Sequence, residues 1–192
     1  MRKVIAGLIM VCAIGFYVVH LLNLGEANEK SSSTQNKEVT KETEIAKVLE
    51  SYKEQLANNY PEAPADIMNT YNALLEIAYG GKITEDELPQ YVKVVRMMYS
   101  KGFNELNPEE KQLSGLSQEL KQNKEKGVNI VASKVEQVYI FRNEKSEETE
   151  ATVTVVHATN NSSDERQYIF IKEDGVWKIN GWQSTHKNTT EE

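Results

Sequence analysis

Two side chains in this sequence could carry out acid–base chemistry, the imidazole of His157 and the carboxylate of Asp66. Either group can serve when an apolar pocket and neighbouring charges bring its pKa toward the working pH. His157 lies in a run of β-type residues, and strand alternation puts it on the same face as Val153 and Val155. That face is the buried one if the neighbouring threonines face water, which makes His157 the better candidate.

Each of these two residues also has a structural role that is more common for its type. A lone histidine in a strand is usually a hydrogen-bonded residue of the core or of the sheet edge. Asp66 follows Pro64 by two residues, and an acid in the first turn stabilises a helix N-terminus. We therefore assign no catalytic residue from the sequence and keep acid–base catalysis by His157 as an alternative.

Five aromatic side chains could line a ligand cavity, namely Tyr52, Tyr71, Tyr91, Tyr99 and Trp177. The tyrosines occupy apolar stripes at helical spacing, so their rings are predicted to fill the core and their hydroxyls to reach its rim. Trp177 shares a strand face with Ile179 and is predicted to anchor the last strand in the core. Trp182, beyond Gly181, is predicted to be half exposed.

The histidines and the cysteine are placed poorly for metal binding. His20 lies in the apolar N-terminal run and His186 in the polar tail, so His157 has no histidine or cysteine partner. The single cysteine, Cys12, is also in the apolar run, and the rest of the chain therefore has no thiol and no disulfide. We expect no metal and no cofactor.

The N-terminal segment has the composition of a membrane anchor. Arg2 and Lys3 precede residues 4–22, a run without Asp, Glu, Lys or Arg. As a helix this run would span about 28 Å, close to the ~30 Å hydrocarbon core of a bilayer. The positive charges in front of it predict a cytoplasmic N-terminus and a single span through the cell membrane, with the remaining chain outside.

The N-terminal segment has two alternative interpretations. Cleavage after Ala27 would release a secreted domain, because Gly25 and Ala27 are small residues suited to a signal-peptidase site. The apolar run is longer than such a signal needs. Lipid attachment at Cys12 fits poorly, since Val11 stands where a small residue is expected and apolar sequence continues beyond it.

Composition divides the rest of the chain. The N-terminal segment comprises residues 1–25. Residues 26–41 follow it, have no aromatic side chain and are predicted to form a flexible polar spacer. One domain is predicted over residues 42–186, and a polar tail over residues 187–192. The formal net charge of the chain is −7, although its first 25 residues add only positive charge. An acidic domain suits phosphate backbones poorly, so no nucleic-acid binding is expected.

Apolar periodicity predicts four helices followed by four strands. The first helix is an apolar stripe from Ile45 to Leu56, and the second begins at Pro64 and stops at Gly80-Gly81. The third has a capping box at Thr84 and Glu87 and ends near Gly102. The fourth is capped by Asn107, has Pro108 at its first position and ends at Gly127. The strands are predicted over Val128–Arg142, Ala151–Thr159, Arg166–Lys172 and Val176–Trp182. This order predicts an α+β fold whose helices pack on one face of a four-stranded antiparallel sheet.

The segment Glu173–Ile179 is similar to the start of the final strand in nuclear-transport-factor-2-like (cystatin-like) domains, where a charged residue and glycine precede Trp-Lys-Ile. Residues 42–186 resemble that superfamily, and in particular its uncharacterised membrane-anchored members from low-GC Gram-positive bacteria. The resemblance implies a cone-shaped domain in which the helices lie against the curved sheet. The superfamily contains enzymes and non-catalytic scaffolds, so the resemblance implies no single activity.

Two predicted strand segments, Val135–Phe141 and Tyr168–Ile171, are apolar at both alternating positions, whereas a sheet with one solvated face should alternate. We therefore expect the outer sheet face to be covered by a second copy, by another envelope protein or by the chain's own tail. The sequence favours a membrane-anchored, extracytoplasmic and non-catalytic binding or assembly module. The alternative is a ligand-binding or weakly enzymatic cone with His157 as the acid–base residue.

Overall fold

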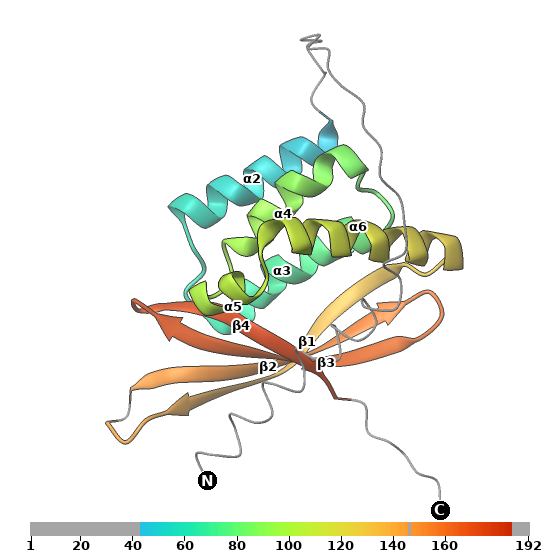
Figure 1. The fold of residues 1–192 in the computed structure, drawn as a ribbon. Coiled ribbons are helices and arrows are strands. Elements are labelled where there is room, and N and C mark those ends of the chain that lie inside the picture. Colours follow the sequence, from blue (N-terminus) through green and yellow to red (C-terminus); the bar gives the residue numbers. More distant parts are fainter. Residues whose placement is uncertain (1–42, 146, 186–192) are drawn as a thin grey trace, which may run out of the picture. The chain divides into compact units, whose positions relative to one another are not determined.

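Helices precede a four-stranded antiparallel sheet in the computed structural model, which describes residues 43–145 and 147–185 (Figure 1). The helices are α2 (Glu44–Asn58), α3 (Pro64–Tyr79), the 3₁₀ helix η1 (Glu85–Glu87), α4 (Leu88–Arg96), α5 (Lys101–Leu106) and α6 (Glu109–Lys126). The strands are β1 (Ile130–Arg142), β2 (Glu148–Thr159), β3 (Ser163–Glu173) and β4 (Val176–Ser184). The predicted α+β class, with helices first and an antiparallel sheet last, is confirmed.

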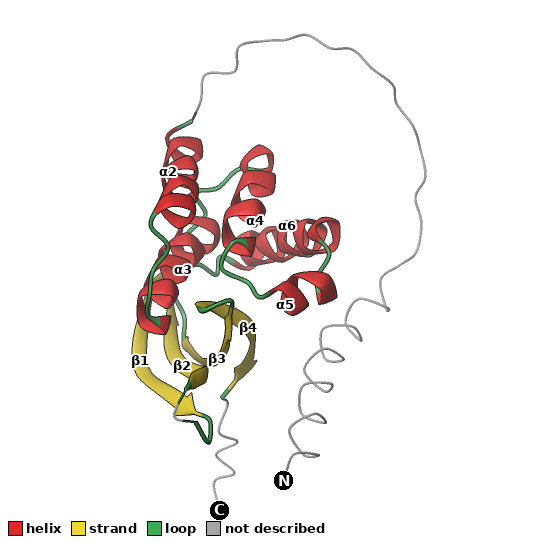
Figure 2. Cartoon of the chain, turned by 90° about the vertical axis from the view of Figure 1, so that its left-hand side faces the viewer, coloured by secondary structure: helices red, strands yellow, loops and turns green. Residues whose placement is uncertain are grey.

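The sheet is a meander in which each strand pairs with its neighbour in sequence, in the order β1-β2-β3-β4. The helices lie on one side of it (Figures 1 and 2). We call the face turned toward them the inner face and the opposite one the outer face. On β2 the inner residues Ala151, Val153 and Val155 are fully buried, and Thr152 and Thr154 alternate with them. The predicted alternation of this strand is therefore confirmed.

The hydrophobic core forms where α3 and α4 meet the inner face of the sheet. Ile67, Met68 and Leu74 of α3 are fully buried, because apolar residues recur at helical spacing on one side of this helix. The sheet contributes fully buried side chains such as Val153 and Phe170. The remaining core residues come from the same elements, from α2 and from the segment after α4, and include Leu49, Leu56, Val92, Val95, Met98, Tyr168, Trp177 and Ile179.

The prediction of one helix from Thr84 to Gly102 is wrong. The capping box at Thr84 is present, but it opens the 3₁₀ helix η1 before α4, and α4 ends at Arg96. The chain then runs alongside β4: the Ile179 N–H donates to the carbonyl of Met98, and the Ser100 N–H donates to the carbonyl of Ile179, both at 2.8 Å. These two bonds take Met98–Ser100 out of the helix. The Ser100 side chain then caps α5, which contains Gly102.

The predicted start of the last helix is also corrected. Pro108 occupies the N-cap of α6 and makes no side-chain capping bond, whereas we predicted it one position further on, with Asn107 as the cap. Asn107 instead closes α5, and its side-chain amide donates to the carbonyl of Phe103 at 2.9 Å. The predicted end is confirmed, because Gly127 adopts a left-handed conformation with φ 64°.

The predicted anchor (residues 4–22), the signal cleavage site near Ala27, the spacer (residues 26–41) and the tail (residues 187–192) lie outside the described residues. Within residues 43–145 and 147–185, no helix is both long enough and apolar enough to cross a membrane.

Candidate functional site

Three side chains form a hydrogen-bonded string across the inner face of neighbouring strands. Ser133 of β1 stands opposite His157 of β2, and its hydroxyl lies 2.9 Å from the Nδ1 atom of the imidazole. The Nε2 atom of His157 lies 2.9 Å from the hydroxyl of Tyr168 on β3. Both His157 and Tyr168 are only 1% exposed. The predicted placement of His157 on the buried face with Val153 and Val155 is confirmed, and both of its ring nitrogens are engaged in the core.

The pKa of His157 is lowered from its ordinary value of 6.5 to about 4, chiefly by burial and also by the positive charge of Arg166, while Asp164 acts in the opposite sense. The imidazole is therefore neutral at neutral pH, with one nitrogen donating and the other accepting. Burial also raises the pKa of the Tyr168 hydroxyl, to about 12. Both groups are thus held in their uncharged forms.

A second pair of hydroxyls lies close to this string. The hydroxyls of Tyr71 on α3 and Tyr99 after α4 are 3.0 Å apart. The Tyr71 ring also meets the Tyr168 ring edge-on, with 5.7 Å between the centroids. Burial raises the pKa of both Tyr71 and Tyr99 above 10. The helices and the sheet therefore meet through a tyrosine cluster, Tyr71, Tyr99 and Tyr168, whose hydroxyls are paired inside the core.

A double-mutant cycle on this pair should show a positive coupling energy. Tyr71→Phe leaves the buried hydroxyl of Tyr99 without its partner and is expected to lower the free energy of unfolding by about 1–2 kcal/mol, with a similar loss for Tyr99→Phe. The double variant should lose less than the sum of the two, because no hydroxyl remains unpaired. Urea unfolding measures all three variants, and strictly additive losses would contradict the hydrogen bond.

The remaining candidates are placed as structural residues. Tyr91 and Trp177 are each 3% exposed and belong to the core, as predicted, whereas Tyr52 is half-buried at its border. Asp66 is exposed in the first turn of α3, where a carboxylate complements the helix dipole. Trp182 is half-buried, as predicted, and lies under the guanidinium of Arg166, 4.6 Å from its ring.

Sequence reasoning missed three charged side chains near the Ser133–His157–Tyr168 string, namely Glu76, Asp164 and Arg166. Asp164 and Arg166 follow the alternation of β3 and lie on the inner face with Tyr168, and Arg166 Nε donates to Asp164 Oδ2 at 2.6 Å. The carboxylate of Glu76 on α3 accepts the backbone N–H of Ser133 at 2.7 Å. The alternation of β3 was a usable signal for Asp164 and Arg166. The approach of Glu76 to β1 depends on how the helix packs, which the sequence pattern does not specify.

An open hollow of about 740 Å³ lies away from these residues, at the end of the sheet that carries the β1–β2 and β3–β4 turns. Opposite charges meet in it, since Arg142 Nη2 donates to Glu148 Oε1 at 2.6 Å. Its walls are formed by Arg142, Glu147, Glu148, Thr149, Lys172 and Gly175. None of the side chains singled out for chemistry lines this hollow. Within the part of the chain described, no three His, Cys, Asp or Glu side chains converge as a metal site requires.

Comparison with known proteins identifies the family. Residues 1–182 match the model of a family described as "Domain of unknown function (DUF6715)". The chain belongs to the DUF6715 family. A search of curated proteins gave no match. Among solved structures, the intermembrane space region of the chloroplast protein ARC6 is similar to this DUF6715 chain at 13% identity with a TM-score of 0.35, covering 66% of this chain and 100% of that one. A TM-score this low supports no inference about fold or function.

Proposed function

We propose that this DUF6715 chain is a non-catalytic binding or assembly module of the cell envelope, anchored by residues 4–22 with its folded domain outside the cell membrane. The observation that carries the proposal is a set of exposed aromatic side chains on the outer sheet face, away from the helices. The family description names no activity, so the proposal rests on this surface and on the composition of the N-terminal segment.

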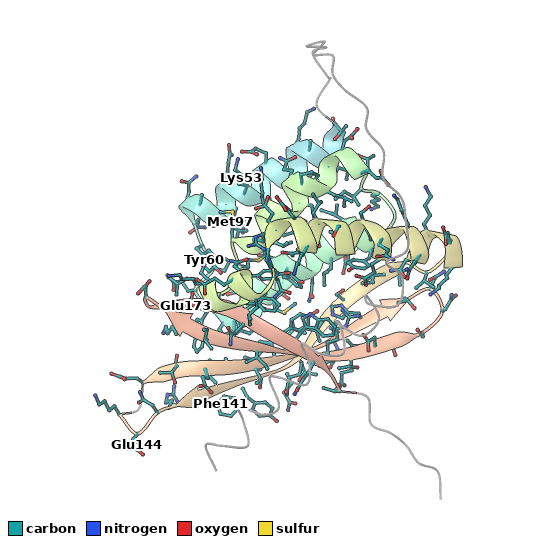
Figure 3. The ribbon with its side chains drawn as sticks, viewed as in Figure 1. Lys53, Tyr60, Met97, Phe141, Glu144 and Glu173 are labelled. Carbon is teal, nitrogen blue, oxygen red and sulfur yellow. The ribbon has the colours of Figure 1, made fainter. Side chains whose placement is uncertain are left out.

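The outer face near the β1–β2 turn carries large apolar side chains that the other described residues leave exposed. Tyr139 and Phe141 are each 51% exposed. Across the sheet, Tyr139 stands beside Thr152, which stands beside Ile169. In the same way, Phe141 stands beside Glu150, which stands beside Ile171. Figure 3 shows Phe141 on the side of the sheet away from the helices. Exposed apolar side chains that cluster in this way are typical of protein interaction surfaces.

The inner face supports the same proposal, because its polar groups are used for packing. His157 is bonded at both ring nitrogens and the tyrosine hydroxyls pair with each other, so acid–base catalysis would first require the core to open. For this reason we do not favour the ligand-binding or enzymatic alternative. The finer assignment of the fold, a nuclear-transport-factor-2-like cone, belongs to this proposal and is supported by the order of helices and strands.

The proposal can be tested on the full chain in its native membranes, extracted with a mild detergent. Phe141→Lys and Ile171→Lys each place a charge on the outer face and should shift the chain to a smaller species in native electrophoresis. Leu106→Lys is the matched control, because Leu106 is an apolar residue of α5 that is 75% exposed. Its complex should keep the original size. If all three variants migrate like the original chain, the outer face is not an assembly surface.

A further inference from the structure

The β1 strand has one edge that no described strand occupies. It pairs with β2 on one side, and it lies at the border of the sheet. Near its start the free edge is covered, because the Ser133 N–H, which points away from β2, donates to the Glu76 carboxylate of α3. Figure 2 shows the far end of β1 extending beyond the helices. The uncovered part of the edge therefore lies toward the β1–β2 turn.

Irregularities in the strand limit the part that can accept a new partner. The register between β1 and β2 shifts between Val135 and Gln137, and again between Phe141 and Arg142. Residues 137–141 form the regular stretch between these shifts, and we call them the edge segment. Tyr139, Ile140 and Phe141 within it are 51%, 42% and 51% exposed. An unpaired edge with exposed apolar side chains is a template for another strand.

We propose that the edge segment pairs with the edge segment of a second copy of this chain, antiparallel and about a two-fold axis at Tyr139. The inference rests on the proposed assembly function and names the partner. An isologous contact of this kind uses the same surface on both copies. It joins the two sheets into one continuous sheet, with the aromatic side chains of both copies on the same outer face.

The backbone directions fit this arrangement. Along β2, pairs with β1 alternate between hydrogen-bonded and non-hydrogen-bonded. The N–H of Ser133, which stands opposite His157, points away from β2. Val138 and Ile140 pair with β2 residues that lie an even number of positions from His157. Their N–H groups therefore point away from β2 as well. With Tyr139 on the axis, Val138 of one copy faces Ile140 of the other. These two residues then exchange both of their free backbone hydrogen bonds, and the edge segment is used symmetrically.

Charge selects this register over its neighbours. With Tyr139 on the axis, counting along the strand sets Glu136 of one copy opposite Arg142 of the other, just beyond each end of the edge segment, where the new pair would add to the ion pairs of Glu136 with Lys134 and of Arg142 with Glu148. A slip that centres Val138 would set Lys134 against Arg142, and one that centres Ile140 would set Glu136 against Glu144. Like charges directly opposite each other destabilise a strand pair. A shift of the pairing by only one residue would turn the aromatic side chains of one copy to the opposite face of the joined sheet.

A disulfide at the axis tests the proposal in the full chain. Tyr139→Cys, in a Cys12→Ser background, should form a disulfide-linked dimer under mild oxidation, because Cα atoms in a non-hydrogen-bonded antiparallel pair are ~4.5 Å apart and within disulfide range. Val131→Cys is the matched control. Val131 is 60% exposed on the same strand but outside the edge segment, and its dimer should be several-fold less abundant on non-reducing gels.

The charges test the register independently. Added to the Tyr139→Cys chain, Glu136→Arg or Arg142→Glu should each lower the yield of dimer, and the two together should restore it. Equal dimer from Tyr139→Cys and Val131→Cys, or no recovery in the double variant, would overturn the second-copy inference. If the cross-link fails while Ile171→Lys still shrinks the native complex, the assembly function stands with a different partner. If neither effect is seen, both proposals are wrong.

Discussion

Trp177→Ala is expected to lower the free energy of unfolding by about 3–5 kcal/mol, the range for removing a large aromatic side chain from a core. Trp177 is 3% exposed and belongs to the cluster that joins β4 to the helices. Its loss removes the transfer free energy of the indole and leaves a cavity that the neighbouring strands fill only in part. Urea unfolding followed by circular dichroism measures the change as a lower midpoint at constant slope.

Val176→Ala is the control for this variant. Val176 precedes Trp177 on the same strand but is 37% exposed, so its truncation is expected to cost less than about 1 kcal/mol. A loss for Trp177→Ala as small as that for Val176→Ala would contradict the closed core. It would instead favour the ligand-cavity alternative, in which the indole lines a solvent-filled space.

Acidification is expected to destabilise the fold through His157 by about 3 kcal/mol between pH 6.5 and pH 4, since each pKa unit corresponds to 1.36 kcal/mol. The folded state lowers the pKa of His157 from 6.5 to about 4, chiefly through burial. Within this window the unfolded chain binds a proton that the folded chain does not, so stability falls as the pH falls. Above pH 6.5 the contribution is complete, and below pH 4 this residue causes no further loss.

The contribution of His157 can be separated from that of the carboxylates by a neutral variant. His157→Gln keeps hydrogen-bonding capacity but has no titrating ring, so the stability difference between the original chain and this variant should shrink as the pH is lowered from 6.5 to 4. Unfolding free energies at several pH values within this window measure it. A difference that stays constant across the window would mean that His157 takes up its proton equally well when folded.

Local signals predicted most of the fold. The alternation of β2 placed His157 on the buried face, and the glycine turn before Trp177 correctly marked the start of β4. These features depend on residues close in sequence, where strand period and turn chemistry act directly. The acidic first turn at Asp66 and the helix stop at Gly127 were predicted for the same reason.

Contacts between distant segments were not predicted. The helical pattern through Met98 continues beyond the true end of α4, because Ile179 draws this segment alongside β4 with backbone hydrogen bonds that leave no mark on side-chain periodicity. The partners of His157 were missed for a related reason. Ser133 reaches it through a strand register that the sequence does not specify, and the Tyr71–Tyr99 bond depends on how α3 packs beside the end of α4.

The Met98–Ser100 segment also determines how far such a sheet can grow. Its two hydrogen bonds with Ile179 occupy part of the edge of β4, so the open edge segment is at β1. A sheet with two open edges could add copies without limit and form a fibre. In the proposed two-fold pair the open segments of both chains face each other, and the outer borders of the joined sheet are the two β4 strands, whose edges are covered in part by Met98–Ser100. The proposed association would therefore stop at two copies.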